Sequence, residues 1–206
     1  GGAIQIGRDE YNIYSNVVNC NFINNEAIAH NLNNSHGGAG CVRAGITYQN
    51  CKFINNSADQ GGALTYHASG NIKDCFFINN SAKLYGGALS TGYIDMDMNL
   101  KVANCNFEQN NAPYGGAVQL KGKNIEIQKS TFNKNVASVN GGAVNIIAKT
   151  VTIDDVDFNK NIANVNGGAV YINGYKTTVV DSSFIANEAI PDVKKLDDGL
   201  GGAIYI

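Results

Sequence analysis

The sequence feature that most constrains the fold is a short motif that recurs along the whole chain. Phe is followed by Asn three residues later and by Ala five residues later, and Gly-Gly-Ala follows after a gap. The clearest copies are residues 132–137 with 141–143, and residues 158–163 with 167–169. The basal unit of about 24–26 residues, with occasional insertions, is the signature of a solenoid whose repeats pack on their neighbours.

The residues of the motif keep their spacing through seven copies. The aromatic positions are Phe22, Phe53, Phe77, Phe107, Phe132, Phe158 and Phe184, and the amide positions are Asn25, Asn56, Asn80, Asn110, Asn135, Asn161 and Asn187. We expect these residues to be structural. Phe should stack on Phe along the axis at roughly 4.8 Å. Asn should form an amide ladder at a turn, because Asn tolerates the left-handed conformation and can bond to the next coil.

Between the motifs, apolar and polar residues alternate. Residues 125–127 and 151–153 both read apolar, polar, apolar, and β-branched residues are enriched there. This period of two indicates strands, and no window keeps a helical period. We therefore predict an all-β fold: a right-handed parallel β-helix of about seven coils, right-handed because parallel crossovers almost always are. The strands after Gly-Gly should carry an outward, polar and neutral row: Gln5, Thr65, Ser90, Gln119, Asn145, Tyr171 and Tyr205.

Composition limits the classes of partner. The 206 residues have a net charge of −2 and only 16% charged residues, which argues against nucleic acid. The sequence has no transmembrane run and no signal peptide, and it starts and stops inside the motif. We expect one β-helix segment over residues 1–206, an excerpt of a longer repeat protein. Side loops are expected at residues 28–36, 90–99 and 190–200, where solenoids often bind.

Four cysteines share one place in the repeat, two residues before Phe: Cys20, Cys51, Cys75 and Cys105. Later coils have Ser130, Val156 and Ser182 there. A stack of small buried residues is the favoured interpretation. Disulfides between adjacent coils and a metal site are the alternatives. Cys41 has no assigned role.

Candidate chemical sites are few, and we expect no catalytic residue and no cofactor. The Asp side chains are expected in solvated turns. Asp154, Asp157 and Asp181 on neighbouring coils are a weak calcium candidate, because carboxylate oxygens are the ligands that calcium prefers. A polysaccharide-degrading site would need pairs of carboxylates on neighbouring coils. Asn33, Asn55 and Asn79 begin Asn-x-Ser sequons, of which Asn33 is the least hindered acceptor.

Candidate ligand contacts lie on the side loops and on the outward row. Amides can bond hydroxyl groups, and aromatic rings can pack on the apolar faces of sugars. The residues selected on these grounds are His30, Asn33, His36, Tyr171, Lys194, Lys195 and Tyr205.

The repeated Phe-x-x-Asn and Gly-Gly-Ala-[Ile/Leu/Val] segments resemble two groups of surface proteins. One group is the passengers of chlamydial polymorphic outer-membrane proteins, and the other is the adhesin-like proteins of methanogenic archaea. Asn-rich phrases such as residues 51–58 are more similar to the archaeal type. The copy at residues 37–40 departs from the motif, with Gly40 in place of an apolar residue. The resemblance implies a secreted or surface-displayed β-helix that attaches to other cells, and it carries over no catalytic residue.

The function expected from the sequence is adhesion. The partners would be a glycan or protein on a host or neighbouring cell, and neighbouring coils of the same parent chain. A polysaccharide lyase or hydrolase is the alternative, and a spacer that binds nothing is a third reading.

Overall fold

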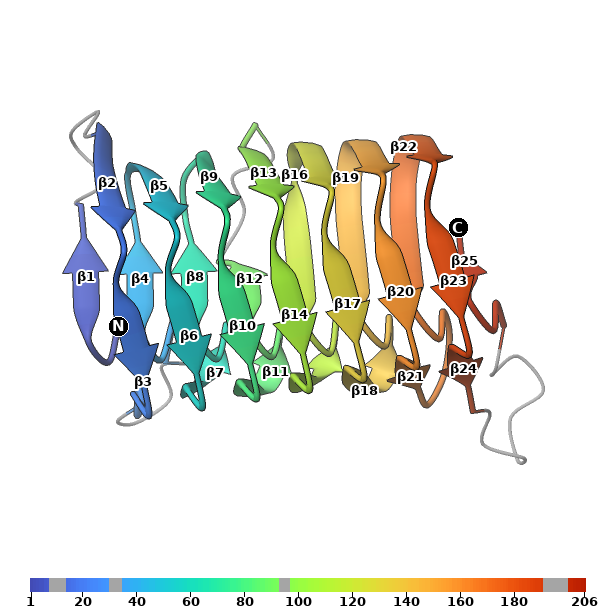
Figure 1. Ribbon diagram of the computed structural model, residues 1–206, viewed down its shortest axis with the longest axis horizontal. Helices are drawn as coiled ribbons and strands as arrows, with labels where there is room; N and C mark the ends of the chain where they lie inside the picture. The colour runs from blue at the N-terminus through green and yellow to red at the C-terminus, as the bar shows by residue number, and fades with distance from the viewer. Residues whose placement is uncertain (8–13, 30–34, 93–96, 191–199) are drawn as a thin grey trace.

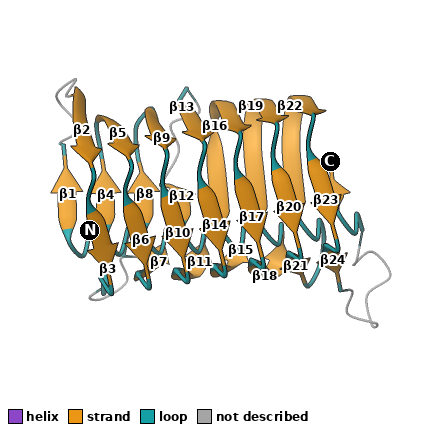
Figure 2. Ribbon diagram, in the orientation of Figure 1, coloured by secondary structure: helices purple, strands orange, loops and turns teal. Residues whose placement is uncertain are grey.

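The computed structural model describes residues 1–7, 14–29, 35–92, 97–190 and 200–206, and these residues form 25 strands and no helix (Figure 2). All the strand pairs are parallel. The predicted all-β parallel β-helix is therefore confirmed. No described segment is a helix that could cross a membrane.

The strands form three sheets, each built by stacking one segment of every coil on the same segment of the next (Figure 1). The first sheet contains β1 (Ile4–Ile6), β2 (Tyr14–Val18), β4 (Gly40–Val42), β5 (Gly45–Gln49), β8 (Leu64–Tyr66), β9 (Gly70–Lys73), β12 (Leu89–Thr91), β13 (Asn99–Ala103), β16 (Val118–Gln128), β19 (Val144–Asp154), β22 (Val170–Val180) and β25 (Ile204–Tyr205). The second, which carries the Phe residues, contains β3 (Asn21–Ile23), β6 (Lys52–Ile54), β10 (Phe76–Ile78), β14 (Asn106–Glu108), β17 (Thr131–Asn133), β20 (Asp157–Asn159) and β23 (Ser183–Ile185). The third contains β7 (Ser57–Gln60), β11 (Ser81–Tyr85), β15 (Asn111–Tyr114), β18 (Val136–Asn140), β21 (Ile162–Ala163) and β24 (Glu188–Ala189).

The coil has the predicted right hand. In Figure 1 the Phe strands run down the near face, the strands after Gly-Gly run up the far face, and the chain advances from left to right. Seven Phe strands enclose about six complete turns, close to the predicted seven coils.

Two corners of each coil are made by residues in the left-handed conformation. Among the residues that the structure describes, fourteen residues other than glycine have a positive φ, and they lie three residues before and two residues after each of the seven motif Phe residues. Asn and Asp occupy most of these sites in the early coils, but Lys129, Lys134, Lys160 and Ala186 occupy them later. The corners are therefore imposed by the stacked neighbours as well as by the preference of Asn and Asp for this conformation.

The Phe residues stack as predicted. Successive ring centroids are 4.7–5.0 Å apart and the rings are within 1–12° of parallel. The five inner rings, Phe53, Phe77, Phe107, Phe132 and Phe158, have no exposed surface. Because each ring buries roughly 150–250 Å², this column is the main apolar contact between coils.

The Asn residues three positions after Phe also form a ladder, but not as left-handed turn residues. The left-handed residue is the one before each of them, so the amide itself points into the coil. The side-chain amide of Asn110 donates to the carbonyl oxygens of Phe77 and of the Asn135 side chain, both at 3.0 Å. Five of these amides, from Asn56 to Asn161, are at most 1% exposed. Every buried polar group of the ladder thus gains a partner on an adjacent coil.

The cysteine column fits the interpretation of small buried residues. All five cysteines are free thiols, and four of them are buried. Cys51, Cys75 and Cys105 each donate to the carbonyl two residues earlier, at 3.1–3.2 Å. Ser130 makes the same hydrogen bond at 2.7 Å, which explains why Ser replaces Cys in a later coil.

Candidate functional site

The third corner of each coil, at the two glycines, brings together two outward rows of side chains. The outer row lies on the strands that follow the glycines and consists of Gln5, Cys41, Thr65, Ser90, Gln119, Asn145, Tyr171 and Tyr205. The pre-glycine row lies directly before the glycines and consists of His36, Gln60, Tyr85, Tyr114, Asn140 and Asn166. Both rows run along the axis in register. We call this region the Gly-Gly corner.

The corner is concave, because the first glycine of each pair turns the chain sharply. At Gly115, φ is +63° and an added Cβ would lie 2.0 Å from the carbonyl oxygen of Val118, so no other residue fits without a shift. The bend brings side chains from the two rows together. The hydroxyl of Thr65 donates to the backbone carbonyl of Gln60 at 2.8 Å.

Contacts across the corner extend to the next outward residues of the strands. The ammonium group of Lys121 lies 5.8 Å from the centroid of the Tyr85 ring, within the range of a cation–π contact. The rings of His36 and His67 meet edge to face at 5.1 Å. The pre-glycine row therefore reaches over the face of the first sheet.

The concavity makes the predicted outward row less exposed than an outward position alone would indicate. The residues are outward, as predicted, but Thr65 and Ser90 have no exposed surface, and Gln119 and Asn145 are only 3% and 4% exposed. The alternation of the strand settles which face a residue occupies. It does not settle whether that face is exposed to solvent. Here the pre-glycine row, on the other side of the bend, covers the outer row.

Several buried polar atoms of the corner have no hydrogen-bond partner. They are Nδ1 of His36, Nε2 of Gln60, Oε1 of Gln119 and Oδ1 of Asn145. Leaving a buried donor or acceptor unpaired costs free energy, so each such atom in a folded protein calls for an explanation. Burial, together with the nearby guanidinium of Arg43, lowers the pKa of His36, which keeps its imidazole neutral near pH 7.

At the N-terminal end, the corner opens into a cavity of about 360 Å³. Its polar lining includes Gln5, His36, Cys41 and Arg43. The volume is within the range of small-molecule pockets. The corner is thus closed by side chains in the middle coils and open at this end.

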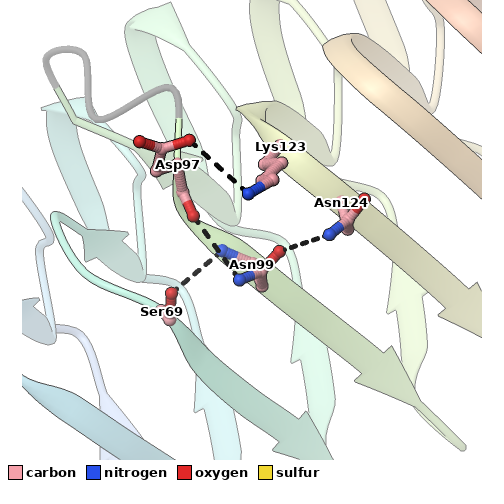
Figure 3. Close-up of polar contacts among 5 residues, drawn as sticks. All are labelled: Ser69, Asp97, Asn99, Lys123 and Asn124. Atoms are coloured by element: carbon pink, nitrogen blue, oxygen red, sulfur yellow. Dashed lines mark hydrogen bonds and ion pairs between the residues drawn. The ribbon is translucent and has the colours of Figure 1, made fainter.

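A second polar cluster lies on the opposite edge of the first sheet (Figure 3). Asn99, at the start of β13, accepts a hydrogen bond from the Asn124 side chain at 2.7 Å and donates its backbone amide to Ser69 at 2.9 Å. An adjacent hollow of about 330 Å³ is lined by these amides and by Lys101 and Glu126, which pair with each other at 3.0 Å.

The two sites differ in how far their polar groups are satisfied. The amides of Asn99 and Asn124 are bonded to one another or to nearby groups. Amide atoms on both walls of the Gly-Gly corner have no partner. A ligand would satisfy groups at the corner that the fold leaves unpaired, so the corner is the stronger candidate.

The structure places three of the predicted contact residues, and all three lie at the corner. His36 is in the pre-glycine row, and Tyr171 and Tyr205 stack with ring centroids 5.1 Å apart. His30, Asn33, Lys194 and Lys195 lie outside the described residues, as do residues 30–34, 93–96 and 191–199 of the predicted side loops. At the ends of the predicted loop 90–99, Ser90 and Thr91 belong to β12 and Asn99 begins β13.

The calcium candidate is not assembled. Asp154 is paired with Val180, not with Asp181, and Asp157 accepts a hydrogen bond from Ser183 on the next coil. Among the described residues, no group of three or more metal-ligating side chains is close enough to hold an ion. The register of the strands is the reason, because it places these carboxylates at different positions of the repeat.

The pre-glycine row was missed by the sequence reasoning. Its signal is nevertheless present, because a large polar or aromatic residue directly precedes Gly-Gly in six copies. A turn would be expected to favour small residues there. The large side chains are accommodated because they lie along the concave wall.

Comparison with known families identifies the repeat. Residues 74–92, 129–146 and 155–173 match the Chlamydia polymorphic membrane protein repeat. Each match begins at a left-handed corner residue; the second and third end within β19 and β22, and the first ends one residue after β12. No curated protein and no solved structure matches the chain. The chlamydial resemblance is thus confirmed at the level of the repeat, while the likeness to the archaeal proteins stays a prediction.

Proposed function

We propose that this chain, which carries three matches to the Chlamydia polymorphic membrane protein repeat, is part of a surface-displayed adhesin. In this proposal the β-helix is a rigid rod that attaches a cell to a glycan or protein on a host or neighbouring cell. The match to a membrane-protein repeat supports a location at the outer membrane or cell surface. The stacked coils, which extend along one axis, suit display away from a surface.

The observation that carries the proposal is the set of unpartnered amide atoms at the Gly-Gly corner. A spacer that binds nothing gains no advantage from buried groups that cost free energy. Strain or unsatisfied polarity that a fold tolerates is typical of functional surfaces. The half-buried tyrosines beside these amides, Tyr85, Tyr114 and Tyr171, add the residue type most enriched at binding interfaces.

We propose binding rather than catalysis, because the corner rows contain no carboxylate. A glycoside-cleaving site needs two carboxylates that flank the scissile bond. The half-buried carboxylate Glu126 is paired with Lys101. Asp59 accepts a hydrogen bond from the backbone of Ser35 and pairs with Lys83. These carboxylates already have partners, which favours a structural role.

Attachment of coated beads to cells tests this function. Beads that carry the chain should adhere to epithelial cells or to bacterial cells above the level of beads that carry an unrelated β-helix of similar charge. Soluble chain should compete for the attachment. Attachment no greater than that of the control beads would contradict adhesion and favour the spacer.

A further inference from the structure

We infer that the Gly-Gly corner binds a neutral oligosaccharide that lies along the axis of the β-helix. The inference rests on the proposed adhesive function and adds to it the site and the class of ligand. It concerns the middle coils, where Gln60, Gln119 and Asn145 leave side-chain atoms unpaired.

The first argument is the mixture of donors and acceptors. Gln60, on the pre-glycine row, has an unpaired donor at Nε2, while Gln119 and Asn145, on the outer row, have unpaired acceptors at Oε1 and Oδ1. All three residues are at least 96% buried. A ligand between the rows must both accept and donate hydrogen bonds. A sugar hydroxyl does both from a single atom.

The second argument is the charge of the walls. Neither row contains a carboxylate, a Lys or an Arg among the described residues, and the cation seen against the pre-glycine row is Lys121. Lys121 already faces the ring of Tyr85. A polyanion would need a row of cations along the corner, and the rows offer amides, hydroxyls and aromatic rings instead.

The third argument is the repeat along the axis. Gln119 and Asn145 are directly paired on adjacent strands, so their amides recur at the inter-strand spacing of roughly 4.8 Å. An extended oligosaccharide presents one sugar unit at a similar interval. Each coil can therefore contact one sugar through an equivalent position, as expected of a solenoid that binds a repetitive ligand.

Aromatic rings supply the apolar part of recognition. Tyr85 and Tyr114 lie side by side with centroids 5.7 Å apart, and both are half-buried beside the amides. A pyranose has an apolar face that packs on such rings. For a sugar to reach the buried amides, these rings must swing outward, and stacking on the sugar then compensates for their lost contacts.

The test measures the affinity of the whole chain for defined probes. Cellohexaose, chitohexaose and maltohexaose represent neutral glycans, and hexagalacturonate represents an acidic one. The expected result is binding of at least one neutral hexasaccharide, with an affinity that changes little with ionic strength, because no ion pair is formed.

The variants Gln119→Met and Asn145→Leu remove the acceptors and keep the side-chain volume. We expect each to weaken binding by roughly tenfold, the effect of one lost hydrogen bond. We also expect each to leave the unfolding temperature unchanged or raised, because a buried unpaired acceptor is removed. This combination distinguishes ligand contact from a structural role, in which stability would fall.

Asn133→Leu is the matched control. Asn133 also has an unpaired buried oxygen, but it lies on the second sheet, away from the corner. Its replacement should leave glycan affinity unchanged. If Gln119→Met and Asn145→Leu bind as wild type does, or if only the acidic probe or no probe binds, the inference is overturned.

These outcomes are separable from those of the bead experiment. Beads that attach to cells while both corner variants bind normally would keep the adhesive function and reject the corner as its site. Beads that do not attach would reject the adhesive function itself.

Discussion

The side-chain oxygen of Asn80 accepts two hydrogen bonds from Asn56, one from its backbone amide at 2.9 Å and one from its side-chain amide at 3.0 Å. The same double contact recurs from Asn80 to Asn110 and from Asn110 to Asn135. Each Asn of the ladder thus holds both the backbone amide and the side-chain amide of the Asn on the preceding coil.

The ladder predicts that Asn110→Ala is strongly destabilising. The change removes the partner of the Phe77 carbonyl and of the Asn80 backbone amide, and it removes one of the two acceptors of the Asn80 side-chain amide, which keeps its bond to the Phe53 carbonyl. Each unpaired buried group costs about 1–3 kcal/mol. We expect a total loss of roughly 3 kcal/mol or more, measured by thermal unfolding. The exposed neighbour is the control, and Asn111→Ala should be nearly neutral. Equal losses would contradict the ladder.

The Phe column predicts that two adjacent Phe residues contribute very differently to the free energy of unfolding. Phe77 has no exposed surface and stacks between Phe53 and Phe107, whereas Phe76 is 42% exposed. Phe77→Ala should lower the free energy of unfolding by about 3–5 kcal/mol. Phe76→Ala should have a far smaller effect. A loss at Phe76 that matches the loss at Phe77 would rule out the inward and outward assignment of this sheet.

Asp59 predicts an acid-sensitive contribution to stability. The backbone N–H of Ser35 donates to its carboxylate, and this bond is the main cause of a lowered pKa; Lys83 contributes further. The stabilisation is therefore present above the unfolded-state pKa of about 3.9 and is lost as the pH falls through the folded-state value.

The measurement compares denaturant unfolding of wild type and Asp59→Asn from pH 7 down to pH 2. The variant should be less stable at pH 7, and the difference should shrink in acid. The exposed turn residue Asp155 provides the control. The free energy of unfolding of Asp155→Asn should match that of wild type across this pH range. A difference that does not change with pH would mean that charge plays no part.

Cys51 predicts a contribution to stability that is lost at alkaline pH, whereas the contribution of Asp59 is lost in acid. Burial raises the pKa of its thiol to about 11, so the neutral thiol is favoured in the folded state. Its contribution is present below the unfolded-state pKa of about 8.5 and is lost as the pH rises towards 11. Cys51→Ser places in the column a residue already present at Ser130. We expect little change at pH 7 and less loss than wild type between about pH 8.5 and 10. The measurement is the free energy of unfolding of both proteins as a function of pH. If the two free energies fall in parallel above about pH 8.5, the prediction is wrong.

Most of the fold could be predicted because its determinants are local and repeated. The spacing of Phe132 and Asn135 is the same in every copy, and the period of two in residues 125–127 identifies a strand directly. The left-handed corners were harder to place. Lys129 and Ala186 adopt that conformation without the sequence preference of Asn, because the coils stacked against them determine their backbone.

The site could be predicted only in part, because concavity is a property of the bend between two sheets. Tyr171 and Tyr205 do lie in the outward row in which the sequence placed them, and their role as ligand contacts stays a prediction. Nothing in the alternation of residues indicates that Thr65 is enclosed while Tyr171 stays partly open. The first glycines of the two coils turn alike, with φ of +58° at Gly61 and +64° at Gly167, so the glycine motif does not reveal the difference either.

The stacking of equivalent residues also has a mechanical consequence. The hydrogen bonds of the ladder and the sheets join one coil to the next, so they point along the rod. A terminal coil is held by one such interface and an inner coil by two, so a tension applied to the chain ends would detach the terminal coil before the next one. The rod would then lengthen in steps of one coil, each releasing about 25 residues, or roughly 85 Å of extended chain, and the force would be similar at every step. A tether that yields in this way dissipates work gradually instead of failing at once.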